Sequence, residues 1–172
     1  MDCIIPINDL KPGQHQYEYD VTNEFFEQFQ NAEVNKGNVH ALLNVTKHGR
    51  GVEVQFNLKG YVTVACDRCL EEFDLNIESN ETLFFEYGTE TGEVSSELIM
   101  IPEGESSLNV SQYIYEFICL AIPFQKYHPD DENGNSTCNK EMLDRLESMK
   151  VNEEEKTTEI DPRWDKLKDL IN

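Results

Sequence analysis

The sequence predicts an α+β protein in which a bent antiparallel sheet forms a partly open barrel or sandwich, with C-terminal helices packed on it. Apolar and polar side chains alternate between residues 39 and 66 and again between residues 73 and 87, which is the period of half-buried strands. Between residues 110 and 121, and between 142 and 149, apolar residues recur at helical intervals instead. Long antiparallel strands that bend tend to curl into a barrel or sandwich.

The predicted sheet occupies residues 1–102. Its strands are expected at residues 4–7, 15–21, 39–45, 52–66, 73–87 and 98–101, with a short Phe-rich helix near residues 25–29. The turn at residues 48–51 joins two of the long strands. The strand that starts at Val52 would span about 50 Å if it ran straight to Cys66, at about 3.3 Å per residue. We therefore expect Gly60 to bend the strand or to form a bulge.

Two helices are predicted after the sheet, at residues 109–122 and 139–150. Asn109 and Asn139 are suited to cap the two helix starts, because an Asn side chain can accept from the free backbone N–H groups of a first turn. Pro123 ends the first helix. Both helices are expected to pack on the sheet.

The same patterns predict the domain organisation. Residues 1–150 would form a single domain, which suits a chain of 172 residues. Residues 151–160 are a charged linker, and residues 161–172 are predicted to form a last short helix. Trp164 and Leu167 lie three residues apart, so this helix is expected to dock through one face.

The charge is strongly negative and uneven. The chain has 34 acidic and 14 basic residues, a net charge of -20. Arg68 is the only basic residue between positions 61 and 123. Phosphate contacts dominate nucleic-acid affinity, so this composition argues against a broad RNA-binding surface. It favours a basic protein as the partner.

The strongest chemical motif is Cys66-Asp67-Arg68-Cys69, which the alternation places at the tip of a β-hairpin. Two thiols at this spacing can bind one metal ion from a tight turn, as in a zinc knuckle. They can also exchange a disulfide, although the βαβ setting typical of thioredoxin-like motifs is not visible. A metal-binding knuckle and a thiol–disulfide module therefore both remain open.

A zinc site needs four ligands, and the best remaining donors are His128 and Cys138. If they join Cys66 and Cys69, residues 125–137 must fold back onto the hairpin tip. Such a site would be structural, because four protein ligands leave no open position. The other cysteines, at positions 3 and 119, are predicted to pack in the core.

Arg68 has two interpretations. It can form a local ion pair with Asp67, Glu71 or Glu72, or it can contact RNA or protein from an exposed tip. No catalytic residue is predicted, because the chain has no nucleophile elbow, no phosphate-binding glycine loop and no His-Glu-x-x-His motif.

The N-terminus has no basic region followed by a long apolar stretch, so no signal peptide is predicted. The longest apolar run, residues 117–124, is too short to span a bilayer. We expect a cytoplasmic protein with no membrane partner.

Two segments resemble the YceD family, the large-ribosomal-RNA-subunit accumulation proteins of bacteria and plastids. Residues 60–71, GYVTVACDRCLE, resemble the family signature, and residues 114–123, IYEFICLAIP, resemble its second block. Three further segments resemble features of one branch of the family: His128-Pro129, Cys138-Asn139 and Asp161-Pro162-Arg163-Trp164. The resemblance covers most of the chain.

The resemblance implies a role in accumulation or processing of large-subunit (23S) ribosomal RNA, without an established enzymatic activity. Many members carry further C-terminal cysteines that could complete a metal site, whereas this chain offers Cys138 and His128. Together with the charge, this predicts a non-enzymatic adaptor for a basic large-subunit ribosomal protein or assembly factor, with rRNA contacted indirectly. The alternatives are an enzyme acting directly on precursor rRNA and a thiol–disulfide module using Cys66 and Cys69.

Overall fold

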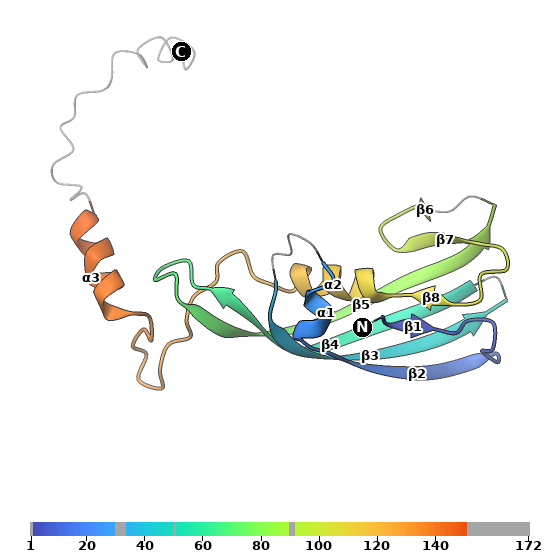
Figure 1. The fold of residues 1–172 in the computed structure, drawn as a ribbon, viewed down its shortest axis with the longest axis horizontal. Helices are drawn as coiled ribbons and strands as arrows, with labels where there is room; N and C mark the ends of the chain where they lie inside the picture. The colour runs from blue at the N-terminus through green and yellow to red at the C-terminus, as the bar shows by residue number, and fades with distance from the viewer. Residues whose placement is uncertain (1, 30–33, 50, 90–91, 151–172) are drawn as a thin grey trace, which may run out of the picture.

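The computed structural model describes residues 2–29, 34–49, 51–89 and 92–150, and it has a mixed α+β fold (Figure 1). A six-stranded sheet has the strand order β2-β3-β4-β5-β7-β6, and a separate pair joins β1 to β8. The strands are β1 (Ile4–Ile5), β2 (Gly13–Val21), β3 (Gly37–His48), β4 (Gly51–Ala65), β5 (Glu72–Gly88), β6 (Gly92–Glu93), β7 (Leu98–Pro102) and β8 (Leu108–Asn109). The helices are α1 (Asn23–Phe26), α2 (Ser111–Leu120) and α3 (Lys140–Met149).

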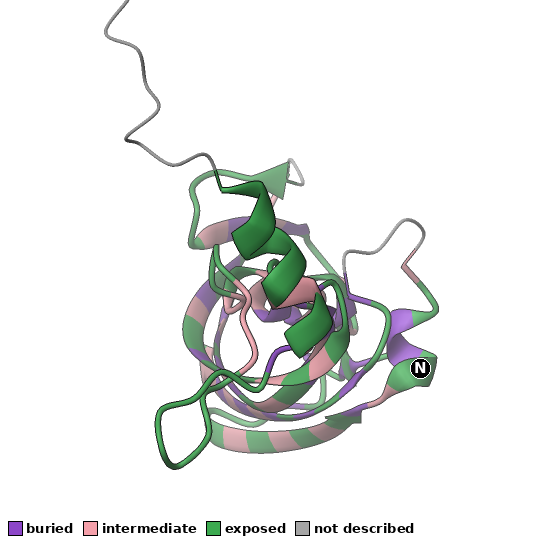
Figure 2. Cartoon of the chain, turned by 90° about the vertical axis from the view of Figure 1, so that its left-hand side faces the viewer, coloured by how far each residue is buried: buried purple, intermediate pink, exposed green. Residues whose placement is uncertain are grey.

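The long hairpins form because alternate residues of β3, β4 and β5 bury apolar side chains on one face. Strand β4 pairs antiparallel with β5 along its whole length and with β3 from Gly51 to Val62, so that Val54 lies between Val45 and Leu83. The predicted face of each strand is therefore confirmed. The sheet curls strongly, and buried and exposed residues alternate along it (Figure 2).

The expectation that Gly60 forms a bulge is wrong. The register is continuous through this residue, which pairs with Val39 on one side and Ile77 on the other. The glycine is needed for another reason: a Cβ atom here would overlap the carbonyl oxygen of Asn38 and lie 2.7 Å from the Cα atom of Val39. The curled sheet thus uses Gly60 for close backbone approach.

The α+β class is confirmed, but the sheet is neither closed into a barrel nor wholly antiparallel. Within the described residues, β2 and β6 lie at opposite edges and do not pair with each other. Strand β7 runs parallel to β5, with Phe85 opposite Ile99. The alternation of side chains is the same in parallel and antiparallel strands, so the sequence pattern could not show this direction.

Helix α2 closes the core against the buried face of the sheet. Its residues Ile114 and Ile118 are fully buried. The ring of Phe117 meets that of Phe56 on β4 with centroids 5.1 Å apart. At the start of the helix, the Ser111 hydroxyl accepts from the backbone N–H of Cys3 at 2.8 Å, which fixes the N-terminal segment over the core.

The expectation that both C-terminal helices pack on the sheet holds for α2 but not for α3. No residue of α3 is buried, and the helix lies beyond the end of the sheet (Figure 1). Its start is capped as predicted, with the Asn139 side chain accepting from the N–H of Met142. The linker predicted at residues 151–160 and the docking helix predicted at residues 161–172 lie outside the described residues.

No helix among the residues described is both long and apolar enough to cross a membrane.

The close approach at Gly60 yields the first prediction. Replacing Gly60 with Ala should lower the free energy of unfolding by about 2–3 kcal/mol, because backbone atoms of β3 cannot move aside as a flexible side chain would. Gly49→Ala is the matched control, since a Cβ at Gly49 meets nothing within 4 Å, and its effect should stay within about 0.5 kcal/mol. Denaturant unfolding measures both. Equal effects would contradict the assigned register of β3 and β4.

Candidate metal centre

The hairpin between β4 and β5 carries the first two candidate ligands. Cys66 follows β4 directly, and the turn that contains Cys69 leads back into β5. The tip is closed by backbone hydrogen bonds from the Cys66 N–H to the Glu71 carbonyl and from the Leu70 N–H to the Cys66 carbonyl, both 2.9 Å. The two cysteine side chains are buried, at 0% and 3% exposure. Both thiols therefore point into the protein from a turn that backbone hydrogen bonds close.

The segment after α2 returns to this tip and supplies the other two candidate ligands. Asp67 binds it twice: its backbone N–H donates to the Lys126 carbonyl at 2.8 Å, and its carboxylate accepts from the Lys126 N–H at 2.7 Å. These bonds place His128 beside the tip. Cys138 follows at the end of the same loop, just before α3. In the structure, residues 125–137 therefore fold back onto the hairpin tip, as the four-ligand site requires.

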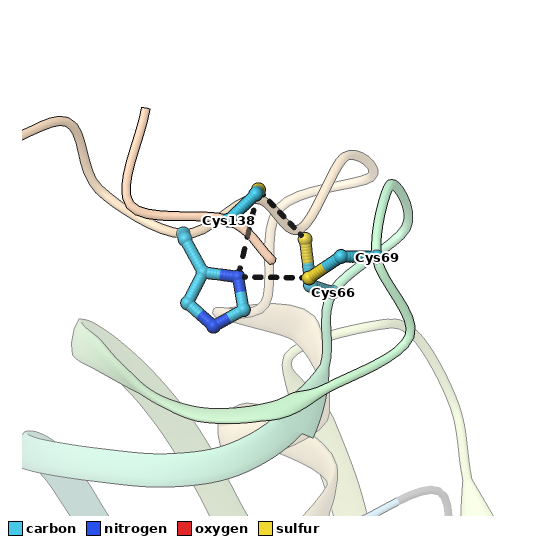
Figure 3. Close-up of side chains that lie close together, drawn as sticks. Cys66, Cys69 and Cys138 are labelled. Carbon is cyan, nitrogen blue, oxygen red and sulfur yellow. Dashed lines mark hydrogen bonds between the residues drawn. The ribbon is translucent and has the colours of Figure 1, made fainter. Parts of the chain in front are cut away.

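All four candidate ligands come together, and Figure 3 labels the three cysteines among them. The Nδ1 atom of His128 lies 3.4 Å from the Cys69 sulfur and 3.7 Å from the Cys138 sulfur. The Cys66 and Cys138 sulfurs are 3.7 Å apart. The four donor atoms all lie within 4.8 Å of one another, and they could hold a metal ion.

The spacing of these donors fits one tetrahedral ion. With metal–sulfur bonds of about 2.3 Å and a metal–nitrogen bond of about 2.0 Å, tetrahedral geometry separates two sulfurs by about 3.8 Å and a sulfur from the nitrogen by about 3.5 Å. The observed separations of 3.4 and 3.7 Å are close to these values. Three sulfurs and one imidazole nitrogen are also donors that zinc accepts in closed sites.

The electrostatics of Cys66 favour a thiolate. Burial raises the pKa of this thiol. Backbone N–H groups of Cys69, Arg68 and His128 donate to its sulfur, and the His128 ring adds a further hydrogen bond. Together these bonds outweigh burial and lower the Cys66 pKa to about 6. A thiolate is the form in which cysteine binds metals.

Cys138 differs from Cys66. A hydrogen bond with Ser136 lowers its pKa, but burial and the neighbouring thiols of Cys66 and Cys69 raise it, and the net pKa is raised. Each ionised sulfur in this group makes the next ionisation harder. A divalent cation among the sulfurs would remove that conflict, because metal coordination deprotonates a thiol outright.

The residues around the cluster supply packing that the sequence patterns did not reveal. The His128 ring packs against the Phe73 ring with centroids 4.6 Å apart and an interplanar angle of 31°, which fixes the orientation of the imidazole. Met142 and Leu143 from the first turn of α3 pack against the cysteines, together with Tyr127. One sequence pattern did bear on this packing. Phe73 has an odd residue number, like the buried residues Ile77, Leu83 and Phe85 of β5, so the alternation places its ring on the inner face of that strand.

Arg68 does not form the expected local ion pair. Its guanidinium lies over the Tyr127 ring, 4.1 Å from the centroid, as a cation–π contact. The nearby acids have other partners: Asp67 binds Lys126, and Glu71 accepts from the Asn139 side chain at 2.7 Å. The contact role of Arg68 stays a prediction. Its position over Tyr127 could not be read from the sequence, because fifty-nine residues separate them.

A metal ion bound by this group would have a structural role. Four protein donors around one ion would leave no coordination position for water or substrate. The buried sulfurs are also poorly placed to attack a disulfide of another molecule, because thiol exchange needs access to the sulfur. The cluster instead joins the hairpin tip to the segment that begins α3.

Comparison with known proteins relates most of the chain to one family. The model of the family described as large ribosomal RNA subunit accumulation protein YceD matches residues 54–171. This match includes the hairpin tip, helix α2 and all four candidate ligands. No curated protein and no solved structure matches the chain.

Proposed function

The chain belongs to the YceD family, and on that premise we propose that it is a ribosome biogenesis factor needed for accumulation or processing of large-subunit (23S) ribosomal RNA. The family match is the observation that carries this proposal, because the family is described by that role. We propose further that the protein works in the cytoplasm without catalysis, as an adaptor that binds a basic ribosomal or assembly protein.

The adaptor mechanism is supported by the charge of the chain and by its distribution on the sheet. A net charge of -20 repels the phosphate backbone of RNA and attracts basic proteins. Acidic side chains are exposed on the outer face of the sheet, among them Glu18 and Asp20 on β2 and Glu78 and Glu86 on β5. We therefore propose that the bound basic protein, and not this chain, makes most of the contacts with rRNA.

We also propose that Cys66, Cys69, His128 and Cys138 bind one structural zinc ion. The proposal is supported by the short separations of the four donors, by the burial of the three sulfurs and by the soft, sulfur-rich ligand set. Magnesium and calcium prefer oxygen ligands, so they fit this set poorly. When bound, the ion would hold the tip and the start of α3 together.

The thiol–disulfide alternative has one observation in its favour, the low pKa of Cys66 of about 6. A low pKa increases the thiolate fraction of a cysteine nucleophile. Cys66 is fully buried, however, and its sulfur lies beside that of Cys138 as well as near Cys69. This environment suits a metal ligand better than a redox centre that must meet a partner.

Zinc content tests the proposed metal site. Protein purified without a metal-affinity step should contain about one zinc per chain, and Cys66→Ser should reduce this to near zero, because hydroxyls replace thiolates poorly at such sites. Cys119→Ser is the matched control, since Cys119 lies in α2 outside the cluster. Elemental analysis makes the measurement. Wild-type protein without zinc, whose Cys66 and Cys69 react fast with an alkylating reagent, would contradict the proposal.

Binding to purified components tests the adaptor role. At about 0.15 M salt, the full chain should retain basic proteins extracted from purified large subunits and release them as salt approaches about 1 M, because screening weakens such contacts. Purified precursor rRNA should be neither retained nor cleaved in the presence of Mg²⁺. Specific cleavage would favour the enzyme alternative. Retention of rRNA without any protein would contradict the adaptor mechanism.

A further inference from the structure

Leu70 has an unusual backbone conformation. Its φ angle is 62°, and it is the only residue other than glycine with a positive φ in the described part of the chain. This left-handed conformation costs an L-residue roughly 1–2 kcal/mol, whereas glycine adopts it freely and Asn tolerates it. The knuckle requires the conformation at this position, but it does not require a leucine.

The Leu70 side chain offers no compensation within the protein, since it is 71% exposed. A single exposed leucine is common on protein surfaces. Here, however, exposure is combined with backbone strain at one residue. Such strain persists where the surrounding structure enforces it, and it clusters at functional positions.

The tip that presents Leu70 is braced from two sides. The Leu70 N–H donates to the Cys66 carbonyl at 2.9 Å, and Asp67 is bonded in both directions to the backbone of Lys126. The Arg68 side chain is held on the Tyr127 ring. A side chain presented by such a turn loses little further freedom when it is bound, which favours its use as an anchor.

The charges beside Leu70 indicate the kind of partner. Exposed carboxylates of Asp67, Glu71 and Glu72 flank it. Asp67 pairs with Lys126 and Glu72 with Lys36, so Glu71 is the one of the three without a basic partner among the described residues. Aliphatic Leu70 offers no face on which a base could stack, and the net charge of -20 repels phosphates, so RNA fits this surface poorly. A basic protein surface with an apolar pocket fits it well.

We propose that Leu70 is the apolar anchor of a protein-docking surface formed by Asp67, Arg68, Leu70 and Glu71, and that the partner is a protein with an apolar pocket rimmed by basic residues. This rests on the proposed function, because it names the site through which the adaptor binds its basic partner. The surface is separate from the metal ligands, which face inward.

The test compares binding and stability in variants of position 70. Leu70→Asn keeps a residue that tolerates the left-handed conformation but removes the apolar side chain. It should weaken binding to the protein fraction of purified large subunits by at least about tenfold without lowering the thermal midpoint. Leu70→Met should retain wild-type binding within about threefold, because it keeps an apolar side chain of similar size. Leu120→Asn is the matched control, as Leu120 is 76% exposed in α2, and its binding should be unchanged.

Each outcome distinguishes the anchor from the adaptor role. If the wild type binds and Leu70→Asn binds equally well, the proposal that Leu70 is an anchor is overturned, and the proposed adaptor role stands. If the wild type binds no large-subunit protein, the anchor proposal and the adaptor role are both overturned. If Leu70→Asn and a second variant, Leu70→Gly, both lower the thermal midpoint, Leu70 has a structural role in the turn and the anchor is overturned.

Discussion

Contact between the β4–β5 hairpin tip and the segment after α2 is the constraint on which the C-terminal half depends. Helix α3 contributes no buried residue, so it cannot be held by burial against the core. Its attachment consists of Met142 and Leu143 against the cysteines, the Asn139 bond to Glu71, and the cluster itself. Hydrogen bonds contribute about 1 kcal/mol each, whereas structural zinc contributes about 10–16 kcal/mol in small peptides. An ion would therefore dominate this attachment.

The length of the central strands explains why the tip needs such a constraint. Strands β4 and β5 continue past the region that α2 covers, and they carry Cys66 and Cys69 beyond the main core. The side chains at this end, such as Phe73 and Leu75, are only partly buried. A metal cluster there would form a second small core of buried cysteines, which the hydrophobic effect alone could not provide from so few residues. The rigid tip in turn lets the chain hold Leu70 in a strained and exposed position.

Much of the fold and of the candidate site could be predicted from the sequence, because both follow local patterns. Alternation identified the buried faces of β3, β4 and β5, and the Cys66–Cys69 spacing identified the tip. His128 and Cys138 were found by elimination among the few remaining donors. The direction of β7 could not be predicted, since Ile99 and Ile101 alternate equally well in either direction. The contact of Arg68 with Tyr127 and the exposed position of α3 depend on how a distant loop returns, which no local pattern encodes.

We propose that one zinc ion is bound by three sulfurs and one nitrogen between the hairpin tip and the loop before α3. X-ray absorption at the zinc edge of the purified full chain tests this most directly, since it reports the ligand atoms themselves. Three sulfurs at about 2.3 Å and one nitrogen at about 2.0 Å are expected. A first shell of oxygen and nitrogen alone, or of two sulfurs with waters, would contradict it, because His128 or Cys138 would then not close the site.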